Sequence, residues 1–322
     1  MKALITGGAG FIGSHLAEEL LALGDSITIV DDLSTGSMDN IGHLKCNKHF
    51  KVYIDTVMNT KLMSKLIKEC DCIYHLAAAV GVKYIIDNQL KSIKTNVEGT
   101  EIVLGLANKY GKKKTLLAST SEVYGKNIDK DRAFKETDDS VLGPTVIPRW
   151  SYACTKVLDE FLALAYVREK KLPVIIVRLF NTCGPRQTGR YGMVLPRFVK
   201  QALSGRPITV YGSGTQTRCF TYVKDVVGAL IELMNCKRAT GEVFNLGSPK
   251  SITINELAKK VKMITGSRSK IEHIPYEKAY ERGFEDMMHR QPDISKIKRY
   301  VDFKPKADIE EIIKRTAEYF KG

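Results

Sequence analysis

KALITGGAGFIG, at residues 2–13, is the stretch that decides the fold of this chain. Residues 2–6 are mostly apolar and predict a short buried strand, and a helical pattern follows the last glycine. Between strand and helix, Gly7 permits a tight turn, Gly10 lets the backbone approach a pyrophosphate, and Gly13 allows close helix packing. The helix N-terminus offers amides and a positive dipole to phosphate groups. The stretch therefore predicts a dinucleotide-binding turn.

An acidic pair at the end of the second predicted strand indicates which dinucleotide is bound. Asp31 and Asp32 follow residues 26–30, downstream of the glycine turn. An acid at this place accepts hydrogen bonds from the ribose hydroxyls of the adenosine and repels a 2′-phosphate. We therefore expect NAD rather than NADP, with Asp55 at the end of the next strand as a partner for the adenine amino group.

Strands and helices alternate along the chain, which indicates a parallel sheet covered by helices. We expect an α/β fold with a Rossmann-type doubly wound sheet and a smaller, interleaved substrate-binding domain, because glycines and prolines shorten the elements after Gly184. The NAD-binding domain is expected at residues 1–180 plus about 219–247, and the nucleotide-sugar-binding domain at about 181–218 plus 248–322. The predicted strands are 2–6, 26–30, 50–54, 72–76, 115–119, 173–179, 208–211, 243–247 and 271–275, and the main predicted helices are about 14–23, 59–69, 93–110, 149–166 and 196–204.

A phenol and an ammonium lie four residues apart in one predicted helix. Tyr152 and Lys156 share a helix face at this spacing. A free phenol has a pKa of about 10, and a nearby cation lowers it. The pair therefore predicts that Tyr152 is a general acid or base near neutral pH.

The predicted strand 115–119 ends in Ser119-Thr120-Ser121-Glu122. Ligands bind at the carboxyl ends of strands in open α/β sheets. We expect these hydroxyls to hold a substrate oxygen while a tyrosine removes its proton.

The bulk properties exclude several other classes of protein. The net charge is +14 over 322 residues, but the basic residues are dispersed and lack the interleaved aromatics of a nucleic-acid-binding face. Seven cysteines without metal-ligand spacing predict reduced thiols and no metal site. No apolar run is long enough to span a membrane, and the first residues lack the layout of a signal peptide. We expect a cytoplasmic protein that acts on a phosphate-bearing small molecule.

Four motifs in order carry a resemblance to a known family: Gly7-x-x-Gly10-x-x-Gly13, Ser119-Thr120-Ser121, Tyr152-x-x-x-Lys156 and Arg178-Leu179-Phe180-Asn181. With them the chain resembles the extended short-chain dehydrogenase/reductase family of nucleotide-sugar enzymes over nearly its whole length. The resemblance implies oxidation at C4 of a UDP-sugar, with NAD accepting the hydride and Tyr152 taking the hydroxyl proton. It also implies that Thr120 and Ser121 hold the oxygen and that Lys156 binds the nicotinamide ribose.

The resemblance further implies a set of binding residues. Arginines suit bidentate contact with a UDP pyrophosphate, and Lys83 or Arg190 is a candidate partner for a substrate carboxylate. The expected cofactor-binding residues are Gly7, Gly10, Phe11, Ile12, Gly13, Asp31, Asp32, Asp55, Leu76, Ala77, Ala78, Asn96, Ser119, Tyr152 and Lys156, and the expected substrate-binding residues are Lys83, Thr120, Asn181, Arg190, Val194, Tyr211, Arg218 and Arg282.

The motifs leave the reaction open. The triplet Thr120-Ser121-Glu122, with Arg149-Trp150 and residues 283–286, resembles UDP-glucuronate decarboxylases, in which a carboxylate at this place helps to orient the keto-acid. Residues 77–84 and 189–194 look more like 4-epimerases. We favour a UDP-hexose or UDP-glucuronate 4-epimerase, with the decarboxylase as the alternative and a 4,6-dehydratase third.

The non-enzyme alternative is an NAD-binding sensor or scaffold, although neither Tyr152 nor Lys156 has been lost. Relatives pair through the helices at about 90–110 and 152–170, so the resemblance also implies a homodimer.

Overall fold

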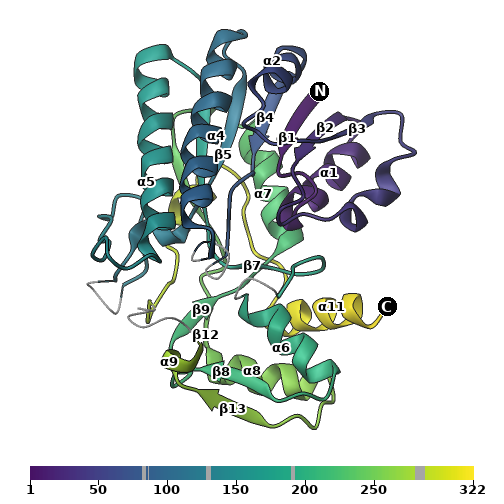
Figure 1. Ribbon diagram of the computed structural model, residues 1–322, viewed down its shortest axis with the longest axis vertical. Coiled ribbons are helices and arrows are strands. Elements are labelled where there is room, and N and C mark those ends of the chain that lie inside the picture. The colour runs from purple at the N-terminus through teal and green to yellow at the C-terminus, as the bar shows by residue number, and fades with distance from the viewer. Residues whose placement is uncertain (82–84, 86, 128–131, 190–192, 280–286) are drawn as a thin grey trace.

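A parallel sheet of seven strands forms the upper part of the molecule in the computed structural model of the chain (Figure 1). The structure describes residues 1–81, 85, 87–127, 132–189, 193–279 and 287–322. The strand order is β3-β2-β1-β4-β5-β6-β11, and each neighbouring pair is parallel. The order reverses between β1 and β4, which is the point where such sheets bind ligands. The strand bounds are β1 Lys2–Thr6, β2 Ser26–Asp31, β3 Phe50–Ile54, β4 Cys72–His75, β5 Lys114–Thr120, β6 Val174–Leu179 and β11 Val243–Leu246.

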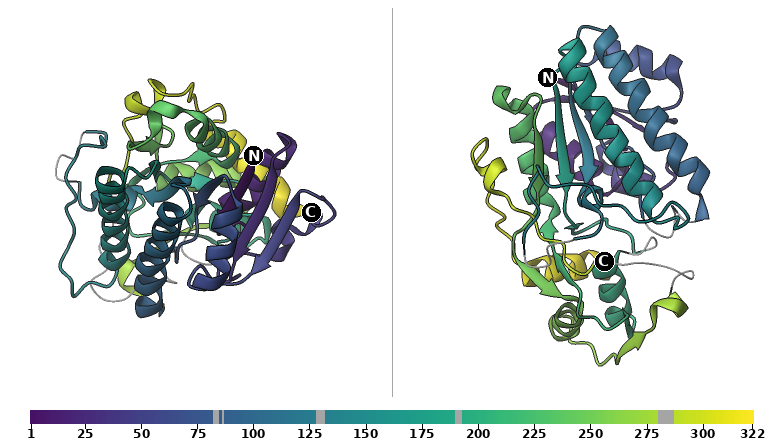
Figure 2. Two further views of the ribbon diagram at one scale, coloured as in Figure 1. Left: turned by 90° about the horizontal axis from the view of Figure 1, so that it is seen from above. Right: turned by 90° about the vertical axis from the view of Figure 1, so that its left-hand side faces the viewer.

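Helices cover both faces of this sheet, which confirms the predicted doubly wound α/β fold (Figure 2). Helices α1 (Phe11–Ala22) and α7 (Val223–Asn235) pack on one face. Helices α2 (Thr60–Glu69), α4 (Gln89–Lys109) and α5 (Trp150–Ala165) pack on the other, and α4 lies beside α5. No helix among the described residues is both long and apolar enough to cross a membrane.

The strands read as continuous apolar runs because both of their faces are buried. Successive side chains of a strand point to opposite faces. In β1, Ala3 and Ile5 pack into the cluster that contains α1 and α7, whereas Leu4 packs into the cluster of α2, α4 and α5. This is the pattern expected of a parallel sheet between two layers of helices.

A smaller group of elements lies below the carboxyl ends of the sheet strands (Figure 1). Its core is an apolar cluster in which α6, α8 and α11 pack around the parallel pair of β8 and β13. The chain enters and leaves this region more than once, because α7 and β11 return to the sheet. The bounds are β7 Thr182–Cys183, α6 Val194–Leu203, β8 Ile208–Tyr211, β9 Thr217–Cys219, β10 Thr221–Tyr222, β12 Ser251–Thr253, α8 Ile254–Ile264, β13 Ile271–Ile274, α9 Tyr276–Ala279 and α11 Ile309–Lys321. Helix α10 (Ser295–Lys298) packs beside β11 in the sheet instead.

Helix starts differ from the prediction where packing outweighs local propensity. Glycine is a poor helix former, so the sequence predicts that α1 starts after the glycine turn, yet the helix starts at Phe11 and includes Gly13. A side chain at Gly13 would place its Cβ 2.3 Å from the carbonyl oxygen of Gly7. Glycine is therefore needed here to let α1 approach the turn. Helix α4 starts at Gln89, earlier than the predicted residue 93.

Candidate active site

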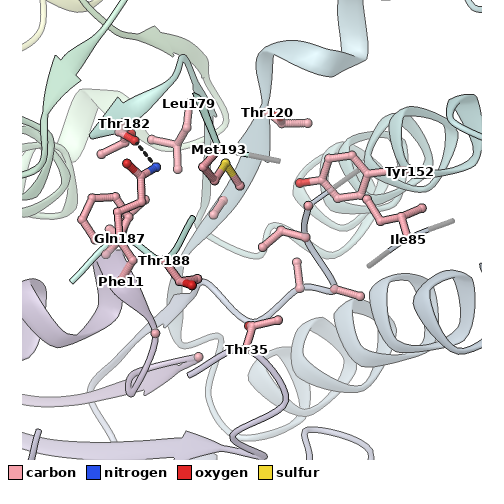
Figure 3. A pocket seen from close by; sticks show the side chains of 18 of the residues that line it. Phe11, Thr35, Ile85, Thr120, Tyr152, Leu179, Thr182, Gln187, Thr188 and Met193 are labelled. Carbon is pink, nitrogen blue, oxygen red and sulfur yellow. Dashed lines mark hydrogen bonds between the residues drawn. The ribbon is translucent and has the colours of Figure 1, made fainter. Parts of the chain in front are cut away.

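A cavity of about 460 Å³ lies at the carboxyl ends of the sheet strands, between the sheet and the lower group of elements (Figure 3). It collects most of the residues predicted from the sequence, although they come from widely separated parts of the chain. The predicted residues that line it are Gly7, Gly10, Phe11, Ile12, Gly13, Asp31, Asp32, Asp55, Leu76, Ala77, Ala78, Ser119, Thr120, Ser121, Glu122, Tyr152, Lys156, Asn181, Val194, Tyr211 and Arg218. Lys83, Arg190 and Arg282 lie outside the described residues.

The glycine turn has the shape that a dinucleotide pyrophosphate requires. Gly7 has a φ of +71°, which favours glycine, and a Cβ there would lie 2.8 Å from the backbone nitrogen of Ala77. The amides at the start of α1 border the cavity at Phe11 and Ile12. Because added side chains would fill this cradle, the turn fits a ligand that approaches the backbone closely.

The acid at the end of β2 connects the glycine turn to the next loop. Asp31 accepts hydrogen bonds from the backbone amides of Ala9, at 2.9 Å, and Leu33, at 2.8 Å. Burial raises the pKa of the Asp31 carboxyl, and the two amides oppose this change. Asp32 and Asp55 line the cavity close by, so the three acids lie where the sequence predicts the adenosine.

Asn96 is not among the residues that line the cavity, so its role as a cofactor ligand stays a prediction without support from the cavity. Its side chain is 1% exposed, and both ends of its amide form hydrogen bonds with other protein groups. Its Oδ1 accepts a hydrogen bond from the backbone amide of Ala79 at 2.8 Å, and its Nδ2 donates to Thr155 Oγ1 at 3.2 Å. Asn96 thus ties the loop after β4 to α5, behind the cavity wall.

The phenol of Tyr152 points into the cavity from α5, with Thr120 nearby at the end of β5 (Figure 3). Burial raises the pKa of Tyr152 well above its ordinary value of about 10, and the charges of Glu122 and Asp159 raise it further. A hydrogen bond with Thr120 and the charge of Arg290 act in the opposite direction. Tyr152 is therefore a stronger base than a free phenolate once ionised, but it needs a nearby cation to ionise at neutral pH.

Lys156 makes contacts that the helix spacing does not predict. Its ammonium donates to Asp159 Oδ2 at 3.1 Å and to the carbonyl oxygen of Ala118 at 3.2 Å. Lys156 is thus anchored at the end of β5 by a carboxylate that sequence reasoning overlooked. A phenol that ionises near neutral pH therefore stays a prediction, which burial opposes in this arrangement.

The hydroxyls after β5 have different partners. Ser119 donates to Glu160, which also accepts from Arg178 at 2.7 Å, so Ser119 is held by an internal network. The Thr120 side chain accepts a hydrogen bond from the amide of Glu122 at 3.2 Å and starts the short turn that follows. Thr120 Oγ1 lies beside the Tyr152 phenol as well, so the two hydroxyl groups can both reach one substrate oxygen.

Two arginines converge on Glu122 at the cavity wall. Arg149 Nη2 donates to Glu122 Oε2 at 3.2 Å, and Arg290 Nη1 donates to Oε1. Arg290 Nη2 also donates to Asn181 Oδ1 at 2.6 Å. Burial opposes ionisation of Glu122, but the two arginines outweigh it and hold the pKa of the carboxyl at about 2. The cluster is charged, and its net positive charge faces the cavity.

Sequence reasoning missed Arg290 because it lies 168 positions beyond Glu122, in a segment without a recognisable motif. Arg149 was noticed only as part of a resemblance. The spacing along the chain carries no signal for this contact.

Gln187 and Thr182 form a second polar group that the sequence did not indicate. Gln187 Nε2 donates to the carbonyl oxygen of Thr182 at 2.9 Å (Figure 3). Gln187 Oε1 and Thr182 Oγ1 are buried and have no hydrogen-bond partner among the described residues. Both residues line the cavity, so these atoms are available to a polar group of a ligand.

The residues expected to hold the nucleotide lie at the far end of the cavity. Arg218 lines it while donating from Nη1 to the carbonyl oxygens of Thr217, at 2.8 Å, and Met287, at 2.7 Å. The Arg197 guanidinium lies 3.7 Å from the centre of the Tyr211 ring. A flat aromatic surface next to two arginines suits a nucleoside diphosphate.

Comparisons with known proteins agree with this geometry. Residues 4–316 match the sequence profile of a family described as GDP-mannose 4,6 dehydratase. The chain is 44% identical over 321 residues to the UDP-N-acetyl-alpha-D-glucosaminuronate decarboxylase of Bacillus cytotoxicus, which aligns over 99% of this chain and 98% of that relative. It is 38% identical to UDP-glucuronic acid decarboxylase 1 of Danio rerio, over 99% of this chain and 72% of the relative.

Solved structures share the fold over the whole chain. The UDP-glucuronic acid 4-epimerase of Bacillus cereus, determined in complex with UDP-glucuronic acid and NAD, superposes with a TM-score of 0.89 at 29% sequence identity. The superposition covers 100% of this chain and 99% of that one.

Proposed function

Because this chain belongs to the GDP-mannose 4,6-dehydratase family of extended short-chain dehydrogenase/reductases, we propose that it is an NAD-dependent UDP-hexuronate decarboxylase. The family membership confirms the resemblance found in the sequence. The sequence patterns favour a 4-epimerase over a decarboxylase, and we now favour the decarboxylase. The two decarboxylases are 44% and 38% identical to this chain, whereas the Bacillus cereus 4-epimerase is 29% identical.

The cluster of Glu122, Arg149 and Arg290 is the observation that supports decarboxylation best. Two guanidinium groups share one carboxylate, so the cluster can accept a second carboxylate from a substrate. Glu122 directly follows Thr120 and Ser121 in the chain, so we expect that second carboxylate to lie next to the sugar carbon that is oxidised. A 4-epimerase that acts on a hexuronate binds the same carboxylate, but it leaves the bond between C5 and that carboxylate intact, so orienting this bond serves no chemical step there.

The first step is oxidation of the C4 hydroxyl. The glycine turn would hold NAD, which would supply a hydride acceptor for C4 that can also return the hydride. Tyr152 takes the hydroxyl proton, and Thr120 and Ser121 donate hydrogen bonds to the oxygen. Because burial raises the pKa of Tyr152, this transfer depends on positive charge near the phenol, and Lys156 supplies it from the same helix.

The second step breaks the bond between C5 and the carboxylate carbon. The C4 ketone lies β to this carboxylate, so the electron pair of the broken bond moves into the carbonyl group and forms an enolate as carbon dioxide leaves. A proton is then added at C5. Arg149 and Arg290 orient the carboxylate before the bond breaks, and hydrogen bonds from Thr120 and Ser121 stabilise the enolate oxygen.

A 4-epimerase stays the second candidate because of the fold shared with the Bacillus cereus enzyme. The 4,6-dehydratase remains third. A sensor or scaffold without activity is the least supported function, since Tyr152, Lys156 and Thr120 line one cavity with the dinucleotide turn.

Three further expectations stay part of this proposal. Exposed apolar side chains on α4 and α5 favour a homodimer through these helices, with Leu90 70%, Leu158 49% and Phe161 63% exposed. The division into an NAD-binding domain at residues 1–180 plus about 219–247 and a sugar-nucleotide domain in the rest also remains a prediction. The cytoplasmic location is likewise still a prediction.

The decisive experiment follows the fate of the carboxylate. The purified protein is incubated with NAD and either UDP-glucuronate or UDP-N-acetylglucosaminuronate, each labelled with ¹³C at C6, and the products are followed by NMR. Release of labelled carbon dioxide supports the proposal and identifies the sugar. A C4 epimer that retains its labelled carboxylate would replace it with the epimerase. UDP-glucose and the variant Tyr152→Phe are the controls that release no label.

A further inference from the structure

Asp159 forms a buried ion pair with Lys156, three positions earlier in α5. Asp159 Oδ2 lies 3.1 Å from Lys156 Nζ, and the two side chains are 1% and 3% exposed. The same ammonium donates to the carbonyl oxygen of Ala118 at 3.2 Å. The catalytic lysine is therefore held between a carboxylate and the end of the strand that carries Thr120.

Stability alone does not explain this carboxylate. Its other oxygen, Oδ1, is buried and makes no hydrogen bond of good geometry, with only the Thr100 hydroxyl of α4 beside it. A buried charged oxygen that is poorly satisfied costs free energy of folding. Glu160, the next residue, shows the contrast, because both of its oxygens accept hydrogen bonds from Arg178.

We propose that Asp159 is a positioning residue of the active site: its carboxylate holds the Lys156 ammonium at the end of β5, in competition with the phenol of Tyr152 and the hydroxyls of a bound ribose. The inference rests on the proposed function only in taking Tyr152 and Lys156 as the proton-transfer pair. Asp159 thereby determines how much of the positive charge of Lys156 acts on Tyr152.

Among the groups packed around Lys156, Asp159 carries the main negative charge. Burial lowers the pKa of His75 to about 3, and Lys156 contributes to this, so the imidazole in β4 is neutral. Thr100 of α4 places a hydroxyl beside Asp159. Glu160 is paired with Arg178.

On the side of the phenol, Glu122 and Arg290 carry opposite charges and are paired with each other. Burial raises the pKa of the Asp159 carboxyl, whereas Lys156 and Thr100 lower it. Asp159 and Glu122 are the acids that raise the pKa of Tyr152 after burial itself.

Removing the charge of Asp159 should therefore favour the phenolate form of Tyr152. The two residues are seven positions apart on α5, which corresponds to about 10 Å along a helix. At an effective dielectric constant of about 20, a unit charge at that distance changes a pKa by about one unit. The Lys156 ammonium, no longer paired with a negative charge, adds an effect of the same sign, so the ratio of phenolate to phenol should rise about tenfold at a given pH.

The test uses Asp159→Asn, which keeps an oxygen acceptor for Lys156 but removes the charge. Asp159→Ser is a second neutral variant in case the first does not fold, and Asp159→Glu restores the charge. Glu101→Gln is the matched control, since it removes one carboxylate from an exposed position on α4. Protein labelled with ¹³Cζ-tyrosine is titrated by NMR with and without NAD, and Tyr152→Phe assigns the resonance. The pH profile of kcat is measured alongside.

We expect both neutral variants to shift the Tyr152 titration and the rising limb of kcat to lower pH by about one unit, while Asp159→Glu and Glu101→Gln stay near the unchanged protein. A Tyr152 titration in the neutral variants that stays in place, or moves to higher pH, overturns the inference. The NMR titration needs no turnover. A protein that releases no carbon dioxide would therefore refute the proposed function without affecting this test.

Discussion

Replacing Arg290 with alanine separates decarboxylation from the oxidation that precedes it. Arg290 donates to Glu122 and, at 2.6 Å, to Asn181, and its side chain is only 10% exposed. The variant leaves Glu122 with Arg149 alone and removes one of the two cations available to a substrate carboxylate. We therefore expect Arg290→Ala to slow the loss of carbon dioxide much more than the formation of NADH.

The size of the effect follows from Coulomb's law. A guanidinium and a carboxylate about 4 Å apart attract by about 4 kcal/mol at an effective dielectric constant of about 20. Desolvation of both groups opposes this attraction. If about 3 kcal/mol remains, its loss slows the step roughly 10²-fold. Oxidation of UDP-glucose, which has no carboxylate, should fall by at most about tenfold, through the loss of a cation near Tyr152.

The assay measures the two steps in one reaction. Absorbance of NADH in a single turnover reports oxidation, and release of ¹³C-labelled carbon dioxide reports decarboxylation. Arg290→Lys keeps the charge but loses the two-pronged geometry. Arg315→Ala is the control, because Arg315 is half-exposed and pairs with Glu311 on α11. Equal losses in both steps, or an equal loss with UDP-glucose, would refute the role of Arg290 at the carboxylate.

Three other predictions concern the cofactor, the acid side of the pH range and assembly. Gly13→Ala should weaken NAD binding at least about tenfold, because its Cβ would lie 2.3 Å from a backbone carbonyl oxygen of the turn. Gly42→Ala is the control, because a Cβ at Gly42 would lie in open space and should leave NAD binding unchanged. Fluorescence titration with NADH compares the two variants. Since the pKa of Glu122 is held at about 2 rather than 4.5, its contribution to the free energy of unfolding, about 3 kcal/mol, is present above pH 4.5 and is lost as the pH falls towards 2. Urea unfolding against pH should show this dependence, and its persistence in Glu122→Gln would contradict the assignment. Phe161→Glu should give a monomer in analytical ultracentrifugation, while Leu23→Glu, at an exposed position just after α1, should leave a dimer.

Patterns of neighbouring residues in the sequence were sufficient to predict the fold and the residues expected to bind NAD. The apolar strand, glycine turn and helix of residues 2–22 form one continuous unit, so the pattern that predicts the turn lies within one short stretch of the chain. The same holds for Tyr152 and Lys156, which helix geometry alone brings to one side. Patterns of this kind are visible in a single sequence because their physical causes are local.

The electrostatics of the site depended on tertiary contacts. Arg290 reaches Glu122 only because the chain returns to the carboxyl edge of the sheet after passing through the lower group of elements. Asn96 carries a predicted ligand motif, yet burial directs both ends of its amide to protein partners. No spacing rule relates such residues to their partners.

The sequence by itself determined that this chain binds a dinucleotide and presents a tyrosine and a lysine to it, since short-range geometry is enough for both. Only the tertiary structure decided which charges surround that pair. Burial raises the pKa of Tyr152, and Asp159 and the end of β5 hold Lys156. Desolvation and long-range charge pairs depend on which distant segments pack together, and that information is absent from any short stretch of sequence.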